Sequence, residues 1–293
     1  MSKILVTGAS GHLGRLVIKH LIDSQTIQPS DIVAGSRDTA KLADLQALGV
    51  EARRVDFDDQ ASLTTALAGI DRLLIISTDE LGMPGKRLTQ HTAAVNAAKA
   101  AGVSRLFYTS MPQPDDSLIT FSGDHLGTEM AIKASGLAYT LFRNGWYMEN
   151  LFMSLPQALA AGTWYTSAGT GRIAHIARED IARAIAAGLA QPAADSVTYT
   201  LTGDTAYTTE EIAALVREVT GKPLAVVNLS DEQLSQGMAA AGVPAPFIPT
   251  FVSFDANTRE GKIAMVSPDA ETLSGVKRIG LKAFLEAHRA ALG

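Results

Sequence analysis

The feature that most constrains this chain is a glycine-rich turn close to its N-terminus. The sequence Val6-Thr-Gly-Ala-Ser-Gly-His-Leu-Gly14 follows a short β-branched run and precedes an amphipathic stretch. Glycines at this spacing let a strand turn into a helix, let the backbone approach a pyrophosphate, and let helix and strand pack closely. The turn therefore predicts a dinucleotide site, with a ligand-free structural turn as the alternative. The residues that would line this site are Gly8, Ala9, Ser10, Gly11, His12, Leu13 and Gly14.

In the first half of the chain, segments with the hydrophobic pattern of strands alternate with segments that have the pattern of helices. Short β-branched runs are separated by longer segments with apolar residues at helical spacing, such as Leu13, Leu16 and Val17. Apolar strands that alternate with amphipathic helices indicate a parallel sheet covered by helices on both faces. Right-handed crossovers make a doubly wound Rossmann sheet, of the α/β class, the simplest topology. The expected strands are 4–7, 32–36, 52–57, 73–77, 106–110 and 139–143.

The residue after the second expected strand distinguishes between the two nicotinamide dinucleotides. An NAD site usually places Asp or Glu here to hold the ribose hydroxyls, whereas this chain has Ser36-Arg37. A guanidinium can form two hydrogen bonds with a 2′-phosphate and can stack on adenine. Arg37 therefore favours NADPH, with an exposed surface arginine as the alternative. Asp56 and Phe57 close the third strand and could border the adenine, although Phe57 is also a candidate core residue.

The regular alternation of expected strands and helices ends at about residue 144. We expect an NADP-binding Rossmann domain over residues 1–144 and a smaller α/β substrate-binding part over 145–293. The two are interleaved, because a β-branched run at 197–202 is expected to join the Rossmann sheet.

Local signals place several helices in this second part. A helix is expected over 148–160, and Asp180 is the expected N-cap of a helix over 181–189. Thr208 and Ser230 each stand three residues before a Glu or Gln, which is capping-box spacing and predicts two further helix starts.

Composition excludes several kinds of site and partner. The chain has no Cys, which excludes disulfides, thiolate metal sites and a Cys nucleophile, and its scattered acids and histidines predict no metal site. The net charge of −5, with both signs mixed, predicts no nucleic-acid partner. No apolar run approaches the about 20 residues of a membrane span, and no signal peptide is evident. We therefore expect a cytoplasmic protein that binds a small molecule and no membrane, while a homo-oligomer stays open.

Longer strings carry a resemblance that covers most of the chain. Besides the glycine-rich turn they are Ser36-Arg37, Leu73-Leu-Ile-Ile-Ser77, Asn96-Ala-Ala-Lys-Ala-Ala-Gly102, Tyr108-Thr-Ser110 and Tyr139-Thr-Leu-Phe-Arg-Asn-Gly-Trp-Tyr-Met-Glu-Asn150. In these strings the chain resembles the NmrA-like, atypical branch of the short-chain dehydrogenase/reductase superfamily. Within that branch it is most similar to the bacterial type 2 NAD(P)H:quinone oxidoreductases, and next to the triphenylmethane-dye reductases.

The resemblance implies a path for NADPH and no flavin. The cofactor would lie along the glycine-rich turn, pass Arg37, and end beside the nicotinamide site after the sixth strand. Taken singly, the residues after the fourth strand could cap a helix, and Asn144-Gly145 could be an ordinary turn. The residues implied along the later part of the path are Ser77, Thr78, Asp79, Asn144, Gly145, Trp146, Tyr147, Met148 and Glu149.

One departure from better-known members of the superfamily bears on mechanism. Those enzymes use Tyr-x-x-x-Lys to protonate a carbonyl, and the segment 121–133 here lacks that pair. The absence argues against alcohol dehydrogenase or epimerase chemistry. It does not argue against quinone reduction, because a quinone accepts hydride readily and its phenolate product can be protonated by water.

We therefore expect NADPH-dependent reduction of a quinone or a similar flat acceptor by direct hydride transfer. Asn144 would hold the nicotinamide, Tyr147 together with Trp146 would form an aromatic wall, and His125 is a candidate proton donor. Alternatively, His125 and Glu129 form a surface pair one helical turn apart. Two other functions stay open: a non-catalytic NADP(H)-binding redox sensor, and a reductase of a triphenylmethane-type dye or a biosynthetic intermediate.

Overall fold

A parallel sheet forms the centre of the molecule. Across the residues described by the computed structural model, 2–191 and 195–292, its strands are β1 (Ile4–Val6), β2 (Ile32–Ser36), β3 (Glu51–Arg54), β4 (Arg72–Ile75), β5 (Arg105–Ser110), β6 (Ala138–Asn144) and β9 (Val197–Leu201). They are ordered β3-β2-β1-β4-β5-β6-β9, and every neighbouring pair is parallel. The order changes direction between β1 and β4, as in a doubly wound Rossmann sheet. The α/β fold expected from the sequence is therefore confirmed.

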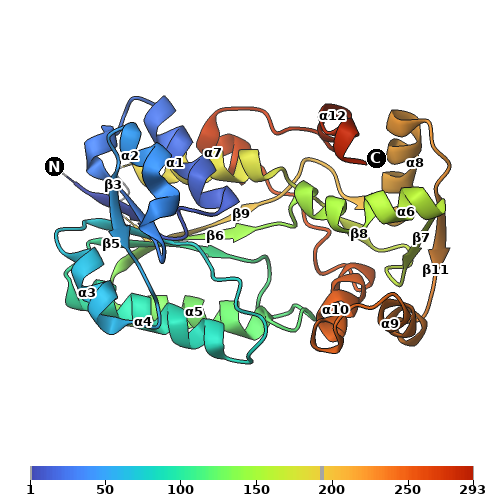
Figure 1. Cartoon of the computed structure of the whole chain (residues 1–293), viewed down its shortest axis with the longest axis horizontal. Helices are drawn as coiled ribbons and strands as arrows, with labels where there is room; N and C mark the ends of the chain where they lie inside the picture. The colour runs from blue at the N-terminus through green and yellow to red at the C-terminus, as the bar shows by residue number, and fades with distance from the viewer. Residues whose placement is uncertain (1, 192–194, 293) are drawn as a thin grey trace.

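Helices cover both faces of this sheet (Figure 1). One layer consists of α1 (His12–Asp23), α2 (Ala43–Ala47), α7 (Arg178–Ala190) and α11 (Asp269–Ser274), and the other of α3 (Gln60–Leu67), α4 (Lys86–Ala100) and α5 (Ser122–Ser135). Ile4 and Val6 pack into the core under the first layer, whereas Leu5 packs into the core under the second. Successive side chains of a strand point to opposite faces, so strands buried on both faces must be apolar throughout.

A third core lies beyond the carboxyl ends of β6 and β9, in the right-hand part of Figure 1. Two small sheets contribute to it, a parallel pair of β7 (Thr163–Thr166) with β11 (Ala225–Asn228) and an antiparallel pair of β8 (Arg172–Ile173) with β10 (Tyr207–Thr208). Around them pack α6 (Leu155–Ala161), α8 (Thr209–Thr220), α9 (Asp231–Ala240), α10 (Ile248–Arg259) and α12 (Leu281–Ala287). Both expected capping boxes, at Thr208 and Ser230, are confirmed.

Two expected helices differ from the structure. The stretch expected as one helix over 148–160 is a 3-10 helix, Met148–Met153, followed by α6. Pro156 in the first turn of α6 has no N–H to continue the preceding helix, so a new helix starts there. Asp180 is not an N-cap, because α7 already begins at Arg178.

The carboxylate of Asp180 has tertiary partners instead. It accepts hydrogen bonds from the Ile279 N–H at 2.8 Å and from Arg183 at 2.9 Å. The first amide of α7, the Arg178 N–H, is bound by both oxygens of Glu149 at 3.1 Å. The helix is therefore capped by a residue far from it in the sequence.

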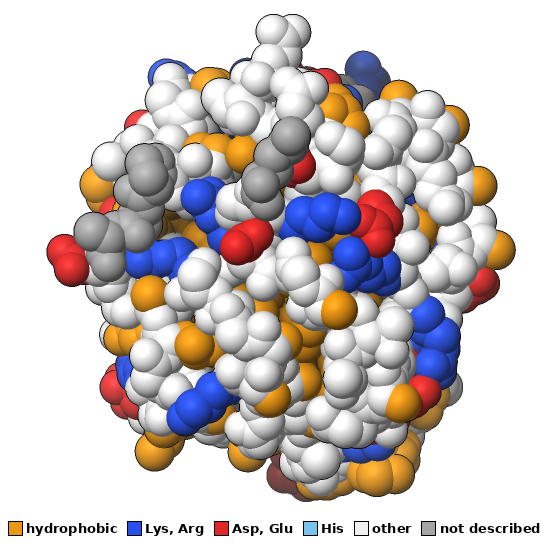
Figure 2. Space-filling model, turned by 90° about the vertical axis from the view of Figure 1, so that its left-hand side faces the viewer, with side chains coloured by type: hydrophobic (Ala, Val, Ile, Leu, Met, Phe, Trp, Pro, Cys, Tyr) orange, Lys and Arg blue, Asp and Glu red, His pale blue; other side chains and the backbone are white. Residues whose placement is uncertain are grey.

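The surface seen in Figure 2 intersperses Lys and Arg side chains with acidic and hydrophobic ones. Lys3 and Arg53 both pair with Glu51 of β3. This face presents no single basic field of the kind that attracts a polyanion.

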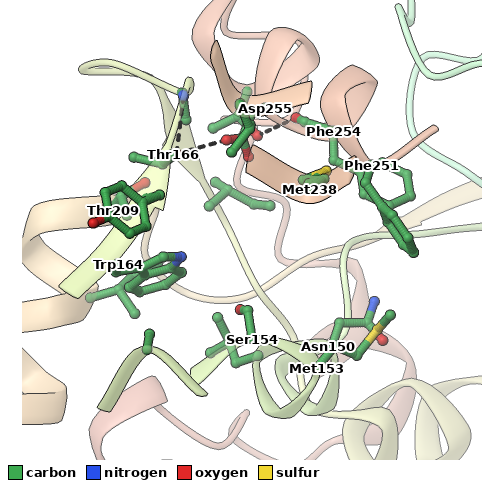
Figure 3. Close-up of a pocket in the computed structure, with 18 of the residues that line it drawn as sticks. Asn150, Met153, Ser154, Trp164, Thr166, Thr209, Met238, Phe251, Phe254 and Asp255 are labelled. Carbon is green, nitrogen blue, oxygen red and sulfur yellow. Dashed lines mark hydrogen bonds between the residues drawn. The ribbon is translucent and has the colours of Figure 1, made fainter. Parts of the chain in front are cut away.

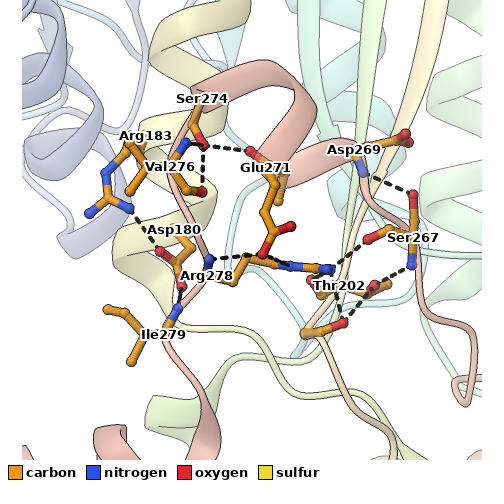
Figure 4. Close-up of polar contacts among 12 residues, drawn as sticks. Asp180, Arg183, Thr202, Ser267, Asp269, Glu271, Ser274, Val276, Arg278 and Ile279 are labelled. Atoms are coloured by element: carbon orange, nitrogen blue, oxygen red, sulfur yellow. Dashed lines mark hydrogen bonds and ion pairs between the residues drawn. The ribbon is translucent and has the colours of Figure 1, made fainter.

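A buried arginine ties the C-terminal segment to the sheet (Figure 4). Arg278 is 9% exposed and donates to the carbonyl oxygens of Thr202 at 2.8 Å, Gly203 at 3.0 Å and Ser267 at 2.5 Å. Its Nε lies 3.3 Å from Glu271. The guanidinium thus joins the end of β9 to the segments on both sides of α11.

We expect Arg278→Met to lower the free energy of unfolding by about 2–3 kcal/mol, because it leaves buried carbonyl groups without donors. Urea unfolding followed by circular dichroism measures this change. The matched control is Arg289→Met, which replaces an exposed arginine and should stay within about 0.5 kcal/mol of wild type. Equal effects of the two substitutions would show that the buried contacts of Arg278 add no stability.

Candidate functional site

The glycine-rich turn joins β1 to α1 through close backbone contact. Gly8 has a φ of 61°, in the left-handed region, and its carbonyl accepts the Gly11 N–H at 2.9 Å. A Cβ on Gly14 would lie 2.4 Å from the Gly8 oxygen, so any side chain there would push α1 off the strand. No side chain caps α1, which leaves its first N–H groups available to an anion.

The end of β2 lies beside this turn. The Ser36 hydroxyl donates to Ser10 Oγ at 3.0 Å. Arg37 follows directly and is exposed, and no described residue forms a hydrogen bond or ion pair with its side chain. The turn and a free guanidinium are therefore brought together at the carboxyl edge of the sheet, which is where a doubly wound fold binds its ligand.

The other expected residues of the turn and of the adenine end differ in accessibility. Ala9 and Leu13 are buried and His12 is exposed. Asp56 is paired with Arg54 at 2.8 Å, and the half-buried Phe57 packs edge-on against His91. Asp56 and Phe57 thus each contact another residue of the protein.

The loop after β4 is anchored by side chains from neighbouring elements. The Ser77 N–H donates to Thr109 Oγ1 at 2.9 Å, and the Thr78 N–H donates to His91 Nε2 at 3.0 Å. Asp79 next to them is exposed. These contacts hold the backbone of residues 77 and 78 at the switch point between β1 and β4.

The hydrogen bonds of His91 determine its tautomer. Because Nε2 accepts a backbone N–H, the ring proton is on Nδ1, which lies 3.0 Å from Thr128 Oγ1. Thr128 in turn donates to the Asp124 carbonyl at 2.7 Å. Burial lowers the pKa of His91 to about 3, so the ring is neutral.

His125 belongs to the same buried region. An Arg87 nitrogen lies 3.1 Å from His125 Nε2, and because a guanidinium only donates, Nε2 must accept. The remaining proton is on Nδ1, 2.8 Å from the Tyr108 hydroxyl. Desolvation and the nearby Arg87 charge lower the pKa of His125 well below its usual value. The imidazole is therefore neutral, and both of its nitrogens are engaged.

The expectation that His125 and Glu129 form a surface pair is wrong. His125 is 5% exposed and Glu129 is fully buried. Both oxygens of Glu129 bind Arg143, at 2.9 and 2.8 Å, and one also accepts the Ser110 hydroxyl at 2.7 Å. Glu129 joins α5 to β5 and β6, because a buried carboxylate needs a cation and hydrogen-bond donors.

Asn144 and Tyr147 meet at the carboxyl end of β6. Asn144 Nδ2 donates to the Tyr147 hydroxyl at 3.4 Å, while the buried Asn144 Oδ1 has no partner among the described residues. The Tyr147 ring packs against the Arg178 guanidinium, 4.9 Å from the ring centre. Burial raises the pKa of Tyr147, so its hydroxyl stays protonated. The Oδ1 of Asn144 is thus available to accept a hydrogen bond from a ligand.

The residues that flank this pair have different surroundings. A Cβ on Gly145 would lie 2.9 Å from the Leu201 oxygen, so the backbone passes close to β9 there. Met148 is buried in the third core, and Glu149 caps α7. Trp146 is half-buried and packs on Phe254, with ring centres 4.3 Å apart.

Trp146 also lines a cavity of about 610 Å³ in the C-terminal part of the molecule. Figure 3 shows Asn150, Met153, Trp164, Phe251 and Asp255 around it, drawn from α10 and from the segments on either side of α6. Its walls are mostly apolar, with a few polar groups, as is usual for a site that buries a small molecule.

The sequence hypotheses missed most of this cavity. They did not single out Phe254, Asp255 or Trp164. The only local signal was the gathering of aromatic residues at 247–254, which does not show that α10 faces β7 across a space.

Within the described ranges, no group of three or more His, Cys, Asp or Glu side chains is placed to hold a metal ion. The same ranges hold no helix with the length and apolar character that crossing a bilayer requires.

Known sequences are similar to this chain along most of its length. The profile of the NmrA-like family matches residues 1–274. Quinone oxidoreductase 2 of Escherichia coli (strain K12) is 38% identical over 271 residues, covering 92% of each chain. An NAD(P)H azoreductase of Xenophilus azovorans is 28% identical over 292 residues, covering 99% of each chain.

Solved structures agree with the sequence matches. The NADPH complex of an NADPH-dependent quinone oxidoreductase from Escherichia coli has a TM-score of 0.92 and 36% identity, covering 98% of this chain and 99% of that one. The NADP(H) complex of Citrobacter sp. triphenylmethane reductase has a TM-score of 0.89 and 32% identity, covering 97% and 99%. By sequence profile, identity and fold, the chain belongs to the NmrA-like family.

Proposed function

We propose that this protein reduces quinones with NADPH by direct hydride transfer, without a flavin or a metal ion. The observation that carries the proposal is the continuity of the site. The edge that begins at the glycine-rich turn and Arg37 ends at Asn144, and two residues later Trp146 forms part of the wall of an apolar cavity of about 610 Å³. The Escherichia coli quinone oxidoreductase, 38% identical in sequence, supports both the acceptor class and the cofactor.

The residues along this edge of the sheet fit the dinucleotide. The uncapped start of α1 would hold the pyrophosphate through its N–H groups. The free Arg37 guanidinium would bind the 2′-phosphate. Ser77 and Thr78, held by Thr109 and His91, would border the ribose of the nicotinamide half. The unpartnered Oδ1 of Asn144 would accept the carboxamide N–H of the nicotinamide, and Tyr147 keeps the Asn144 side chain in that orientation.

The chain itself contributes orientation and exclusion of water. When bound, NADPH supplies a hydride from its nicotinamide ring. Trp146 and Phe254 form an aromatic wall on which a flat acceptor can lie, and the apolar cavity removes water from around it. Holding the two reacting rings together is the main source of rate in such a site.

Neither His91 nor His125 is placed to protonate the acceptor. The one proton of His125 points to Tyr108, and its other nitrogen is occupied by Arg87. We therefore assign His125 a positioning role, and the phenolate product takes its proton from water. The cytoplasmic location and a homo-oligomeric state stay predictions.

The proposal is tested by following NADPH oxidation with a panel of quinones, without added flavin. We expect turnover that is slowed by deuterium at the transferred position when hydride transfer limits the rate. Tight NADPH binding with no oxidation by any quinone, dye or enone would contradict the proposal and favour a redox sensor.

Arg37 should determine the preference for NADPH over NADH. Arg37→Ala should weaken NADPH by roughly 1.5–3 kcal/mol, before screening, because it removes charge-assisted hydrogen bonds to the phosphate. NADH affinity should hardly change, since NADH has no 2′-phosphate. Affinities are measured by fluorescence titration, with Lys41→Ala as a control that removes another exposed cation of this region. Equal affinity of the wild type for both cofactors would contradict the assignment.

Asn144 should matter more to the rate than His125. Asn144→Ala should lower kcat by about 10²-fold, because a displacement of about 1 Å can cost that much. His125→Ala should cost about tenfold or less, whereas a required general acid contributes about 10²–10⁴-fold. Steady-state kinetics with circular dichroism and NADPH affinity measure both effects. A loss above about a thousandfold at His125, with fold and NADPH binding intact, would make His125 the acid.

A further inference from the structure

His175 lies in a segment that runs beside the residues following Asn144. The Ile176 N–H donates to the Trp146 carbonyl at 2.9 Å, and the Met148 N–H donates to the Ile176 carbonyl at 2.9 Å. Ile176 packs into the first core. In extended chain the neighbouring side chain points the opposite way, and His175 accordingly lines the cavity together with Trp146. Its imidazole therefore faces the same cavity as Trp146, which follows Asn144 by two residues.

The imidazole of His175 differs from the other buried histidines in having no partner. It is 6% exposed, its Nδ1 is buried, and no described residue forms a hydrogen bond with the ring. Buried polar groups in proteins are almost always paired, and leaving one unpaired costs about 1–3 kcal/mol. Both nitrogens of His91 and His125 are used by the protein. The donor capacity of His175 is thus left for a ligand.

Burial also determines the state of this ring. It lowers the pKa of His175 to about 4, so at neutral pH the imidazole is uncharged and has one N–H donor and one acceptor nitrogen. A neutral donor in an apolar wall suits an uncharged oxygen acceptor better than an anion.

Two other polar side chains of the cavity wall accept hydrogen bonds from the protein. Asp255 accepts from the Thr166 hydroxyl at 2.8 Å and from the Ser167 N–H at 2.6 Å. Asn257 accepts from the Leu118 N–H at 2.9 Å and from the Ser117 hydroxyl at 3.0 Å. Unlike these two side chains, His175 has a buried ring nitrogen with no hydrogen-bond partner among the described residues.

We infer that His175 is a specificity-determining residue that donates its N–H to a carbonyl oxygen of the acceptor. The inference rests on the proposed function and narrows its substrate class to aromatic carbonyl compounds with an apolar body, such as substituted naphthoquinones. The hydrogen bond orients the acceptor ring at the Trp146 end of the cavity. It also strengthens as negative charge develops on that oxygen during reduction.

The test separates recognition of the carbonyl from simple packing. The protein is loaded with NADP⁺, which prevents turnover, and titrated calorimetrically with 2-methyl-1,4-naphthoquinone and with its carbonyl-free analogue 2-methylnaphthalene. His175→Leu should weaken the quinone by about 5–10-fold, as expected for one lost hydrogen bond. The hydrocarbon should bind no more weakly than to wild type. His175→Gln, which keeps a donor, should retain most of the quinone affinity.

Two controls complete the experiment. His20→Leu replaces a histidine that pairs with Glu179 outside the cavity, and it should leave both affinities unchanged. NADP⁺ affinity reports folding of each variant. Equal weakening of quinone and hydrocarbon, or unchanged quinone binding in His175→Leu, would overturn the inference. If the discrimination is seen but wild type oxidises no NADPH with quinones, the proposed function fails while recognition of the carbonyl stands.

Discussion

The contact between α1 and the turn after β1 is the constraint on which the rest of the site depends. Gly14 approaches the Gly8 carbonyl so closely that even a methyl group would be 2.4 Å from it. That approach places the start of α1 directly at the carboxyl edge of the sheet, beside Ser36 and Arg37. Since parallel strands all end at the same edge, the ends of β4 and β6 lie along it and would supply the remaining residues of the proposed site.

Hydrogen-bond direction determines the tautomers of the buried His91 and His125. A backbone N–H and a guanidinium can only donate, so His91 and His125 must each accept at Nε2. Both rings then serve to hold the loop after β4, α4 and α5 in fixed relation to one another. Neither of these two rings has a proton available to an acceptor, which agrees with a reduction in which water protonates the product.

The sequence predicted best those features whose causes are local. The glycine-rich turn, the apolar strands and the capping boxes at Thr208 and Ser230 each depend on residues within a few positions of one another, and the structure contains them all. Asp180 and Glu129 were misjudged because their partners, Ile279 and Arg143, come from other elements. A side chain with capping or surface-pair spacing can instead accept hydrogen bonds from residues far away in the sequence. The local sequence pattern does not reveal such donors. The cavity was not predicted for the same reason: its walls come from α10 and β7, which are far apart in the sequence and come together only in the folded chain.

The pairing of β9 with β6 has a consequence for the order in which the protein can assemble. Thr140 is hydrogen-bonded across the sheet to the strand that starts at Val197, and the intervening chain builds part of the cavity wall. During synthesis, the edge of β6 stays open until residue 201 has left the ribosome, and Arg278 follows later still to bind the end of β9. Such long-range closure makes folding slow relative to local helix formation. A fragment that ends at residue 144 would carry the dinucleotide turn with an unpaired, apolar strand edge, a surface prone to aggregation.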